Sequence, residues 1–153
     1  MQALYERYGP SLRRKAERLL RNQAEAEDLV QGLFVDLWQR GAAAPDLPYL
    51  FRAVTNRCLN VLRDGTNRQR LLGENASSAV ATSSEGAAIS ADLLARLVGT
   101  LDEKRCSVLV AHWFDDMTQE EIAEVYGLSR KTVGKYLNDV RDALAKLGAE
   151  VGS

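Results

Sequence analysis

A cluster of cationic and hydroxyl side chains near the C-terminus has the residue types and spacing to bind DNA. These side chains follow Gly127 and open a helix expected to run to about residue 147. Guanidinium, ammonium and hydroxyl groups in such a position can donate hydrogen bonds to phosphates and to base edges in a major groove. The candidate DNA-binding residues are Ser129, Arg130, Lys131, Thr132 and Lys135.

The preceding residues predict a helix-turn-helix that would present this cluster. Thr118 and Glu121 have the spacing of a capping box at the start of a first helix. Gly127 stands where the chain needs a left-handed residue, and Ala123 is small where two helices must approach closely. An ordinary helical hairpin with solvated charges is the alternative interpretation. The agreement of cap, small residue, turn glycine and basic second helix favours DNA contact.

A second basic cluster lies on a helix expected over residues 49–64. Its arginine and asparagine side chains lie around an exposed helix beside the aromatic residues Tyr49 and Phe51. Such a surface suits contact with a nucleic-acid backbone and with unstacked bases. A solvated helix face is the alternative. The candidate residues are Tyr49, Arg52, Asn56, Arg57, Asn60 and Arg63.

Residues 22–40 predict an amphipathic helix with a polar face. Asn22 is a candidate N-cap, and apolar pairs recur every four residues as far as Leu37 and Trp38, which predicts one wide buried stripe. Gly32 lies on the opposite face, where an interior glycine costs about 1 kcal/mol relative to alanine. This glycine is either tolerated there or lets a partner approach closely. The polar face consists of Asp28, Gln31, Gly32, Asp36 and Gln39.

Apolar spacing predicts the other helices of the first half. A helical segment near the start carries Lys15 and several arginines on its solvent side, with a kink or restart expected at Gly9-Pro10. The helix over residues 49–64 is expected to bury Val61 together with Leu50, Phe51, Val54, Cys58 and Leu62.

The composition of residues 71–90, rich in Ser, Ala, Thr and Gly, predicts a flexible linker. An amphipathic helix from Leu93 follows, and Asp102 can cap the next helix. The sequence therefore predicts an all-α protein of two small helical domains, residues 1–70 and 91–153, the second containing the helix-turn-helix.

Residues suited to catalysis or metal binding are scarce. Cys58 and Cys106 lack the spacing of metal ligands, and His112 is the only histidine, so no zinc finger or Cys–His nucleophile can be assembled. Both cysteines fall on apolar helix faces and are expected to be buried thiols. With no phosphate-binding loop and no acid–base set, we expect a protein that is not an enzyme and needs no cofactor.

Charge and hydropathy indicate the partners and the location. The net charge is −1, whereas freestanding DNA-binding proteins are usually basic because phosphate neutralisation supplies much of their affinity. A second protein is therefore expected to supply part of the binding energy. No apolar run approaches the ~20 residues that span a bilayer, and the first residues lack the order of a signal peptide. We expect a cytoplasmic protein.

Four stretches together resemble the extracytoplasmic-function sigma factors, the minimal two-domain group of the sigma-70 family. They are LYERYGPSLRR, AEDLVQGLFVDLW, YLFRAVTNRCLNVLRD, and GTLDEKR leading to MTQEEIAEVYGLSRKTVGKYL. The resemblance covers nearly the whole chain outside the linker. It implies a protein that binds core RNA polymerase, recognises a two-part promoter and helps to melt it.

The resemblance also implies residue roles. Asp28, Gln31 and Asp36 would bind the clamp helices of the largest polymerase subunit, although Gly32 replaces a frequent glutamate. Residues 41–64 would open and read the −10 element, and the cluster at Ser129–Lys135 would read the −35 element. Two positions depart from the family pattern in the −10 segment: Asn60 stands where aspartate is common and Asp64 where a basic residue is common.

Two other functions fit parts of the sequence. A stand-alone helix-turn-helix regulator would explain residues 101–147 and would bind DNA tightly without polymerase. A decoy that occupies polymerase without initiating transcription would need no DNA contacts. The resemblance additionally implies an anti-sigma factor as an inhibitory partner.

Overall fold

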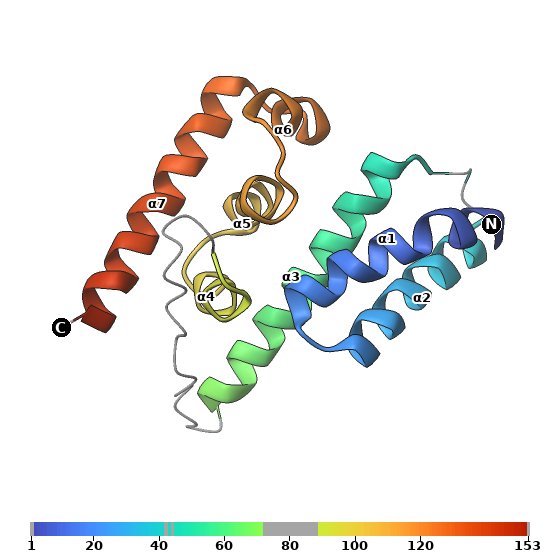
Figure 1. The fold of residues 1–153 in the computed structure, drawn as a ribbon, viewed down its shortest axis with the longest axis horizontal. Helices are drawn as coiled ribbons and strands as arrows, with labels where there is room; N and C mark the ends of the chain where they lie inside the picture. Colours follow the sequence, from blue (N-terminus) through green and yellow to red (C-terminus); the bar gives the residue numbers. More distant parts are fainter. Residues whose placement is uncertain (1, 42, 44, 72–88, 153) are drawn as a thin grey trace. The chain divides into compact units, whose positions relative to one another are not determined.

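The structure is a computed structural model that describes residues 2–41, 43, 45–71 and 89–152. Within these ranges the chain forms seven α-helices, one short π-helix and no strand (Figure 1). The predicted all-α fold is confirmed. None of the described helices has the length and apolar character needed to cross a membrane.

The chain divides into two compact units, Met1–Leu62 and Arg63–Ser153, and the boundary falls within one long helix. The predicted linker, residues 71–90, falls largely on residues 72–88, which lie outside the described residues. Ile89 and Ser90, at its end, are described: Ile89 is buried, and Ser90 caps the helix that follows. Each unit has buried apolar residues of its own.

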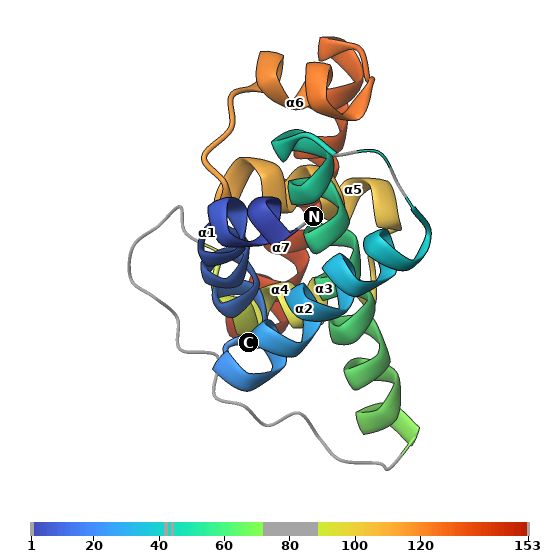
Figure 2. The same ribbon diagram turned by 90° about the vertical axis from the view of Figure 1, so that its right-hand side faces the viewer.

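The first unit consists of α1 (Gln2–Leu20), α2 (Gln23–Gln39) and the greater part of α3 (Leu47–Leu71). The helices α1 and α2 lie side by side in both ribbon views (Figures 1 and 2). Asn22 caps α2 as predicted, because its Oδ1 accepts a hydrogen bond of 3.0 Å from the backbone N–H of Glu25. The buried apolar residues include Leu12, Ala16, Leu19, Ala26, Val30, Leu33, Phe34, Leu37, Leu50, Val54, Cys58 and Leu59.

Two apolar side chains of the first unit lie outside the core, contrary to the prediction. Trp38 is 70% exposed and Val61 is 40% exposed. Trp38 follows Leu37 by about 100° around α2, which turns its side chain away from the buried stripe. On α3, Leu59 is buried in place of Val61. Periodicity gave the correct helices but did not locate the edges of their buried stripes.

A prediction for α1 also differs from the structure. Lys15 is buried rather than solvated, and its Nζ lies 5.2 Å from the centroid of the Phe51 ring of α3. The aromatic face attracts the ammonium group and the long aliphatic stem packs as apolar surface, so burial of this lysine is compensated. The helix does not restart at Gly9-Pro10, since Pro10 lies inside the continuous α1.

The second unit contains α4 (Ala91–Leu97), α5 (Glu103–Leu109), the π-helix η1 (Val110–Phe114), α6 (Gln119–Tyr126) and α7 (Arg130–Gly152). Asp102 caps α5 as predicted, because its Oδ1 accepts a hydrogen bond of 2.9 Å from the N–H of Arg105. Both α5 and α6 pack against α7. One core cluster consists of Val108, Ala111, Ile122, Val133 and Leu137.

Candidate nucleic-acid interface

The helix-turn-helix forms through local hydrogen bonds that the sequence specifies. The N–H of Thr118 donates to Oε1 of Glu121 at 2.9 Å, and the N–H of Glu121 donates to Oγ1 of Thr118 at 3.2 Å. The hydrogen bond from the backbone N–H of Thr118 lowers the pKa of the Glu121 carboxyl group. At the other end of α6, Gly127 has φ 65° and ψ 35°, and the N–H of Leu128 donates to the carbonyl oxygen of Ala123 at 2.9 Å. The predicted capping box and left-handed turn are confirmed.

The start of α7 presents the predicted basic cluster. Lys131 and Lys135 are exposed, whereas Ser129 and Thr132 are partly engaged in the cap. The Ser129 Oγ accepts a hydrogen bond of 3.0 Å from the N–H of Thr132 and donates to its Oγ1 at 2.8 Å. Arg130 is exposed and forms an ion pair of 3.0 Å with Glu120 of α6. All three cations of the cluster are therefore exposed, and Arg130 in addition pairs with Glu120.

Five of the six residues predicted on α3 share one face of that helix. At about 100° per residue, Tyr49, Arg52, Asn56, Asn60 and Arg63 fall within about 80° of one another. Tyr49, Asn56 and Asn60 are exposed, and the two arginines are half-buried. We call these five residues the α3 stripe. The Nε of Arg52 is buried without a hydrogen-bond partner among the described residues. The stripe thus combines an aromatic ring, amide groups and guanidinium groups along one helix.

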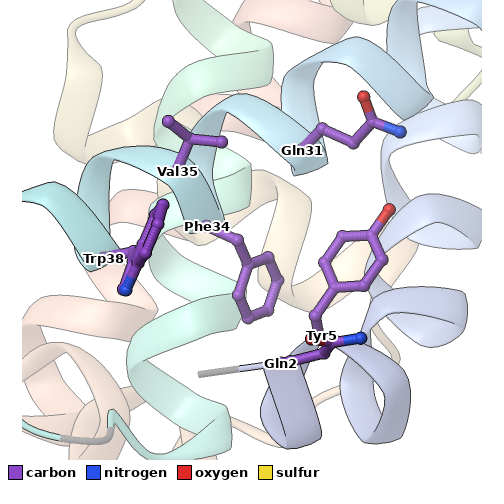
Figure 3. Close-up of a pocket in the computed structure, with 6 residues that line it drawn as sticks. All are labelled: Gln2, Tyr5, Gln31, Phe34, Val35 and Trp38. Carbon is purple, nitrogen blue, oxygen red and sulfur yellow. The ribbon is translucent and has the colours of Figure 1, made fainter.

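The exposed face of α2 borders a groove that the sequence did not predict. The groove has a volume of about 590 Å³ and lies between α1 and α2 (Figure 3). The rings of Tyr5 and Phe34 meet edge to face there, with centroids 5.1 Å apart. Val35 and Trp38 lie three residues apart, and this spacing of two apolar residues outside the buried stripe was the available signal for the groove. The groove is lined by Gln2, Tyr5, Gln31, Phe34, Val35 and Trp38.

Comparison with protein families assigns both halves of the chain. The family model described as Sigma-70 region 2 matches residues 4–68, and the one described as Sigma-70, region 4 matches residues 97–147. The chain belongs to the sigma-70 family. Two such regions in a chain of 153 residues fit its extracytoplasmic-function group. A comparison with curated proteins found no match to the chain.

Family membership gives the general role. Sigma-70 regions 2 and 4 support a function in promoter recognition, as a transcription regulator rather than an enzyme. The region 2 match includes α2 and the α3 stripe, and the region 4 match includes the helix-turn-helix. Both matches lie within the domains predicted as residues 1–70 and 91–153.

Two residues of this sigma factor that were predicted to have different roles are paired with each other. Arg57 of α3 donates from Nη2 to Oδ2 of Asp36 on α2. The hydrogen bond from Arg57 lowers the pKa of Asp36. Arg57 lies about 60° beyond Asn60 around α3, outside the stripe. Asp28 and Gln31, the other two predicted polymerase-binding residues, are exposed on α2.

Asn138 extends the exposed face of α7 and was missed from the sequence. It follows Lys131 by seven residues and Lys135 by three, which is the spacing of one helix face. Its side chain is exposed, and its Oδ1 accepts a hydrogen bond of 3.2 Å from Arg141. Asparagine can bond an adenine edge or a phosphate. We add Asn138 to the candidate DNA-binding residues.

Proposed function

We propose that this sigma factor binds core RNA polymerase, recognises the −35 and −10 elements of a promoter and promotes DNA melting. The observation that carries the proposal is the pairing of a formed helix-turn-helix in region 4 with a polar and aromatic α3 stripe in region 2. A stand-alone helix-turn-helix regulator uses only the first of these surfaces. The site of action is the cytoplasm, where polymerase and promoter DNA meet.

The −35 element is the proposed ligand of α7. A recognition helix places its first residues against base edges in the major groove, while cations and hydroxyl groups bind the backbone. Lys131 and Lys135 are exposed, and Arg130 forms a surface ion pair with Glu120, a kind that contributes about 0–1 kcal/mol. Ser129 orients the helix start through its cap. The proposed −35 set is Ser129, Arg130, Lys131, Thr132, Lys135 and Asn138.

The −10 element is the proposed ligand of the α3 stripe. Melting requires bases to leave the stack, which costs a few kcal/mol, and stacking on aromatic rings offsets about 1–3 kcal/mol per base. Tyr49 provides an exposed ring at the start of α3, where Asp46 caps the helix. Asn56 and Asn60 offer exposed amide groups to base edges, and Arg52 adds a half-buried guanidinium group on the same face. The stripe thus has the groups needed to hold an unstacked strand.

Core polymerase is the proposed partner of the α2 face. Asp28 and Gln31 are exposed side by side at a spacing of three residues. Val35 and Trp38 are 46% and 70% exposed on the same helix, and Trp38 borders the groove in Figure 3. Large exposed apolar side chains beside polar groups are typical of a protein–protein interface. An anti-sigma factor that covers this face and the basic start of α7 would inhibit both functions.

The test combines polymerase binding with promoter binding. We expect the purified protein to co-elute with core polymerase and to bind a promoter fragment specifically only in its presence. The Lys131→Ala/Lys135→Ala variant should still co-elute with the core but should lose the promoter fragment. Tight, specific DNA binding by the free protein, with none to polymerase, would instead identify a stand-alone regulator. Co-elution with no promoter binding by the wild type would identify a decoy.

A further inference from the structure

The ion pair between Arg57 and Asp36 connects two helices that were assigned to different partners. The side chain of Arg57 extends from α3 toward α2, and its Nη2 donates a hydrogen bond to Oδ2 of Asp36. The side chains of Arg57 and Asp36 are 33% and 43% exposed, so the pair is partly accessible rather than enclosed. Arg57 therefore contributes its charge to the surface of α2.

Gly32 provides the space in which the guanidinium group lies. A Cβ atom placed on Gly32 would stand 3.7 Å from Nη1 of Arg57, which is ordinary van der Waals contact. Alanine would fit at this position, whereas a longer side chain would occupy the volume of the guanidinium group. Room for Arg57 therefore explains a small residue at position 32, although glycine within a helix costs about 1 kcal/mol relative to alanine.

The pair leaves hydrogen-bonding capacity on the α2 face. A carboxylate has two oxygens and can accept several hydrogen bonds, while a guanidinium group has five N–H donors. Arg57 uses one donor to hold one oxygen of Asp36. The other oxygen of Asp36 can accept a further hydrogen bond from a partner, on the same helix as Asp28 and Gln31. A held carboxylate loses less side-chain entropy on binding a partner than a free one does.

We propose that Arg57 is a positioning residue of the polymerase-binding face, where it lies over Gly32 and holds the Asp36 carboxylate toward core polymerase, and that it does not contact −10 DNA. The proposal rests on the proposed binding of core polymerase. It removes Arg57 from the DNA-binding set that the sequence suggested. The α3 stripe then acts on DNA without it.

The experiment separates affinity for core polymerase from promoter opening measured at saturating core. Arg57→Ala and Asp36→Ala should each weaken core affinity about 3- to 5-fold, the range of a partly exposed charge pair. The double variant should bind core polymerase about as tightly as the more impaired single variant, because both substitutions remove the same interaction. Arg57→Lys, which keeps the charge, should recover most of the affinity. Promoter opening at saturating core should be unchanged in all four.

Matched variants complete the experiment. Arg52→Ala, on the stripe of the same helix, should leave core affinity unchanged and reduce promoter opening. Gly32→Ala should match the wild type, whereas Gly32→Leu should resemble Arg57→Ala. Helical circular dichroism should match the wild type in each variant, and the melting temperature should not fall. In Gly32→Ala the melting temperature should rise, because alanine is favoured over glycine within a helix by about 1 kcal/mol.

Three results would overturn the proposal. Normal core affinity with reduced promoter opening in Arg57→Ala would make Arg57 a DNA contact. Additive losses in the double variant, or a melting temperature that falls with both activities, would leave the pair without a positioning role. Absence of core binding by the wild-type protein would overturn the proposed function itself. Failure of the positioning role alone would appear only in the variants, so the two failures are distinguishable.

Discussion

At the scale of single residues, Gly127 is a position where backbone conformation alone restricts the amino acid. Its φ of 65° is left-handed, and a Cβ placed there would meet no atom within 4 Å. Gly127→Val should therefore destabilise the second unit by backbone strain, by about 1–2 kcal/mol or more for a β-branched side chain. Urea denaturation monitored by circular dichroism measures this loss.

Asparagine at the same position is the control, because it adopts the left-handed region more readily than other non-glycine residues. Gly127→Asn should cost clearly less than Gly127→Val. Equal losses for the two variants would show that the space around residue 127, and not its φ, restricts the side chain.

The capping box gives the helix-turn-helix a dependence on pH. Hydrogen bonds to Thr118 lower the folded-state pKa of Glu121 below its ordinary value of 4.5. A carboxylate with a lowered pKa stabilises the fold above its unfolded pKa, and this contribution is lost as the pH falls through the folded pKa. The wild type should therefore be more stable than Glu121→Gln at pH 7, and the difference should close as the pH falls below about 4.

Urea midpoints of the two proteins between pH 7 and pH 3 test this expectation. A Glu121→Ala variant serves as a second reference that has no side chain to complete the box. If the difference between wild type and Glu121→Gln stayed constant across this range, ionisation of Glu121 would have no part in the cap.

At the scale of elements, α2 has a buried apolar stripe and, outside it, two large apolar side chains that are exposed, Val35 and Trp38. Leu37 is buried in the first unit, whereas its neighbour Trp38 is 70% exposed beside the groove. Trp38→Ala should leave stability within about 0.5 kcal/mol of the wild type, as substitutions at exposed sites usually do, and should weaken binding to core polymerase. Leu37→Ala should cost about 2–5 kcal/mol of stability. Thermal melts and core titrations of both variants separate the two roles.

Two results would contradict the assignment of Leu37 to the core and of Trp38 to the polymerase interface. If Trp38→Ala unfolded the first unit, the ring would be part of its core. If the variant kept full affinity for the core, the groove would lie outside the polymerase interface.

The helix caps and the contacts between helices show how far the sequence could predict the site. The Asn22 cap, the capping box of Thr118 and the turn at Gly127 were predicted because each depends on residues within a few positions of one another. The exposure of Trp38 and the ion pair of Asp36 with Arg57 depend on where α1 and α3 lie against α2. That packing is set by tertiary structure, which the spacing of apolar residues does not specify.

Burial of a charged residue shows the same limit. Lys15 reads as a solvated residue among arginines, yet it is buried against Phe51, which is 36 positions away in the chain. A pattern within one helix cannot indicate an aromatic partner on another. The family resemblance predicted the two regions correctly because whole motifs, rather than single side chains, carry it.

At the scale of the whole molecule, charge explains why this sigma factor should need polymerase to bind DNA. Its net charge is −1, with 20 basic and 21 acidic residues, so little general attraction to DNA is available. Under the proposed function, the cations exposed at the start of α7 act locally once polymerase has brought the helix to the promoter. Their contribution should appear in the salt dependence of promoter binding.

The affected quantity is the slope of the logarithm of the promoter-binding constant of the holoenzyme against the logarithm of salt concentration. Lys131→Ala and Lys135→Ala should each reduce the magnitude of this slope by about 0.9, the value for one phosphate contact on duplex DNA. Lys146→Ala is the matched control, because Lys146 is exposed on the same helix, farther from its start. Its slope should equal that of the wild type.

Equal reductions in all three variants would indicate a general charge effect along α7, whereas no reduction at Lys131 or Lys135 would place the −35 contacts elsewhere. Because removal of a phosphate contact weakens binding to all sequences alike, a loss confined to one promoter sequence would instead indicate that these lysines read bases.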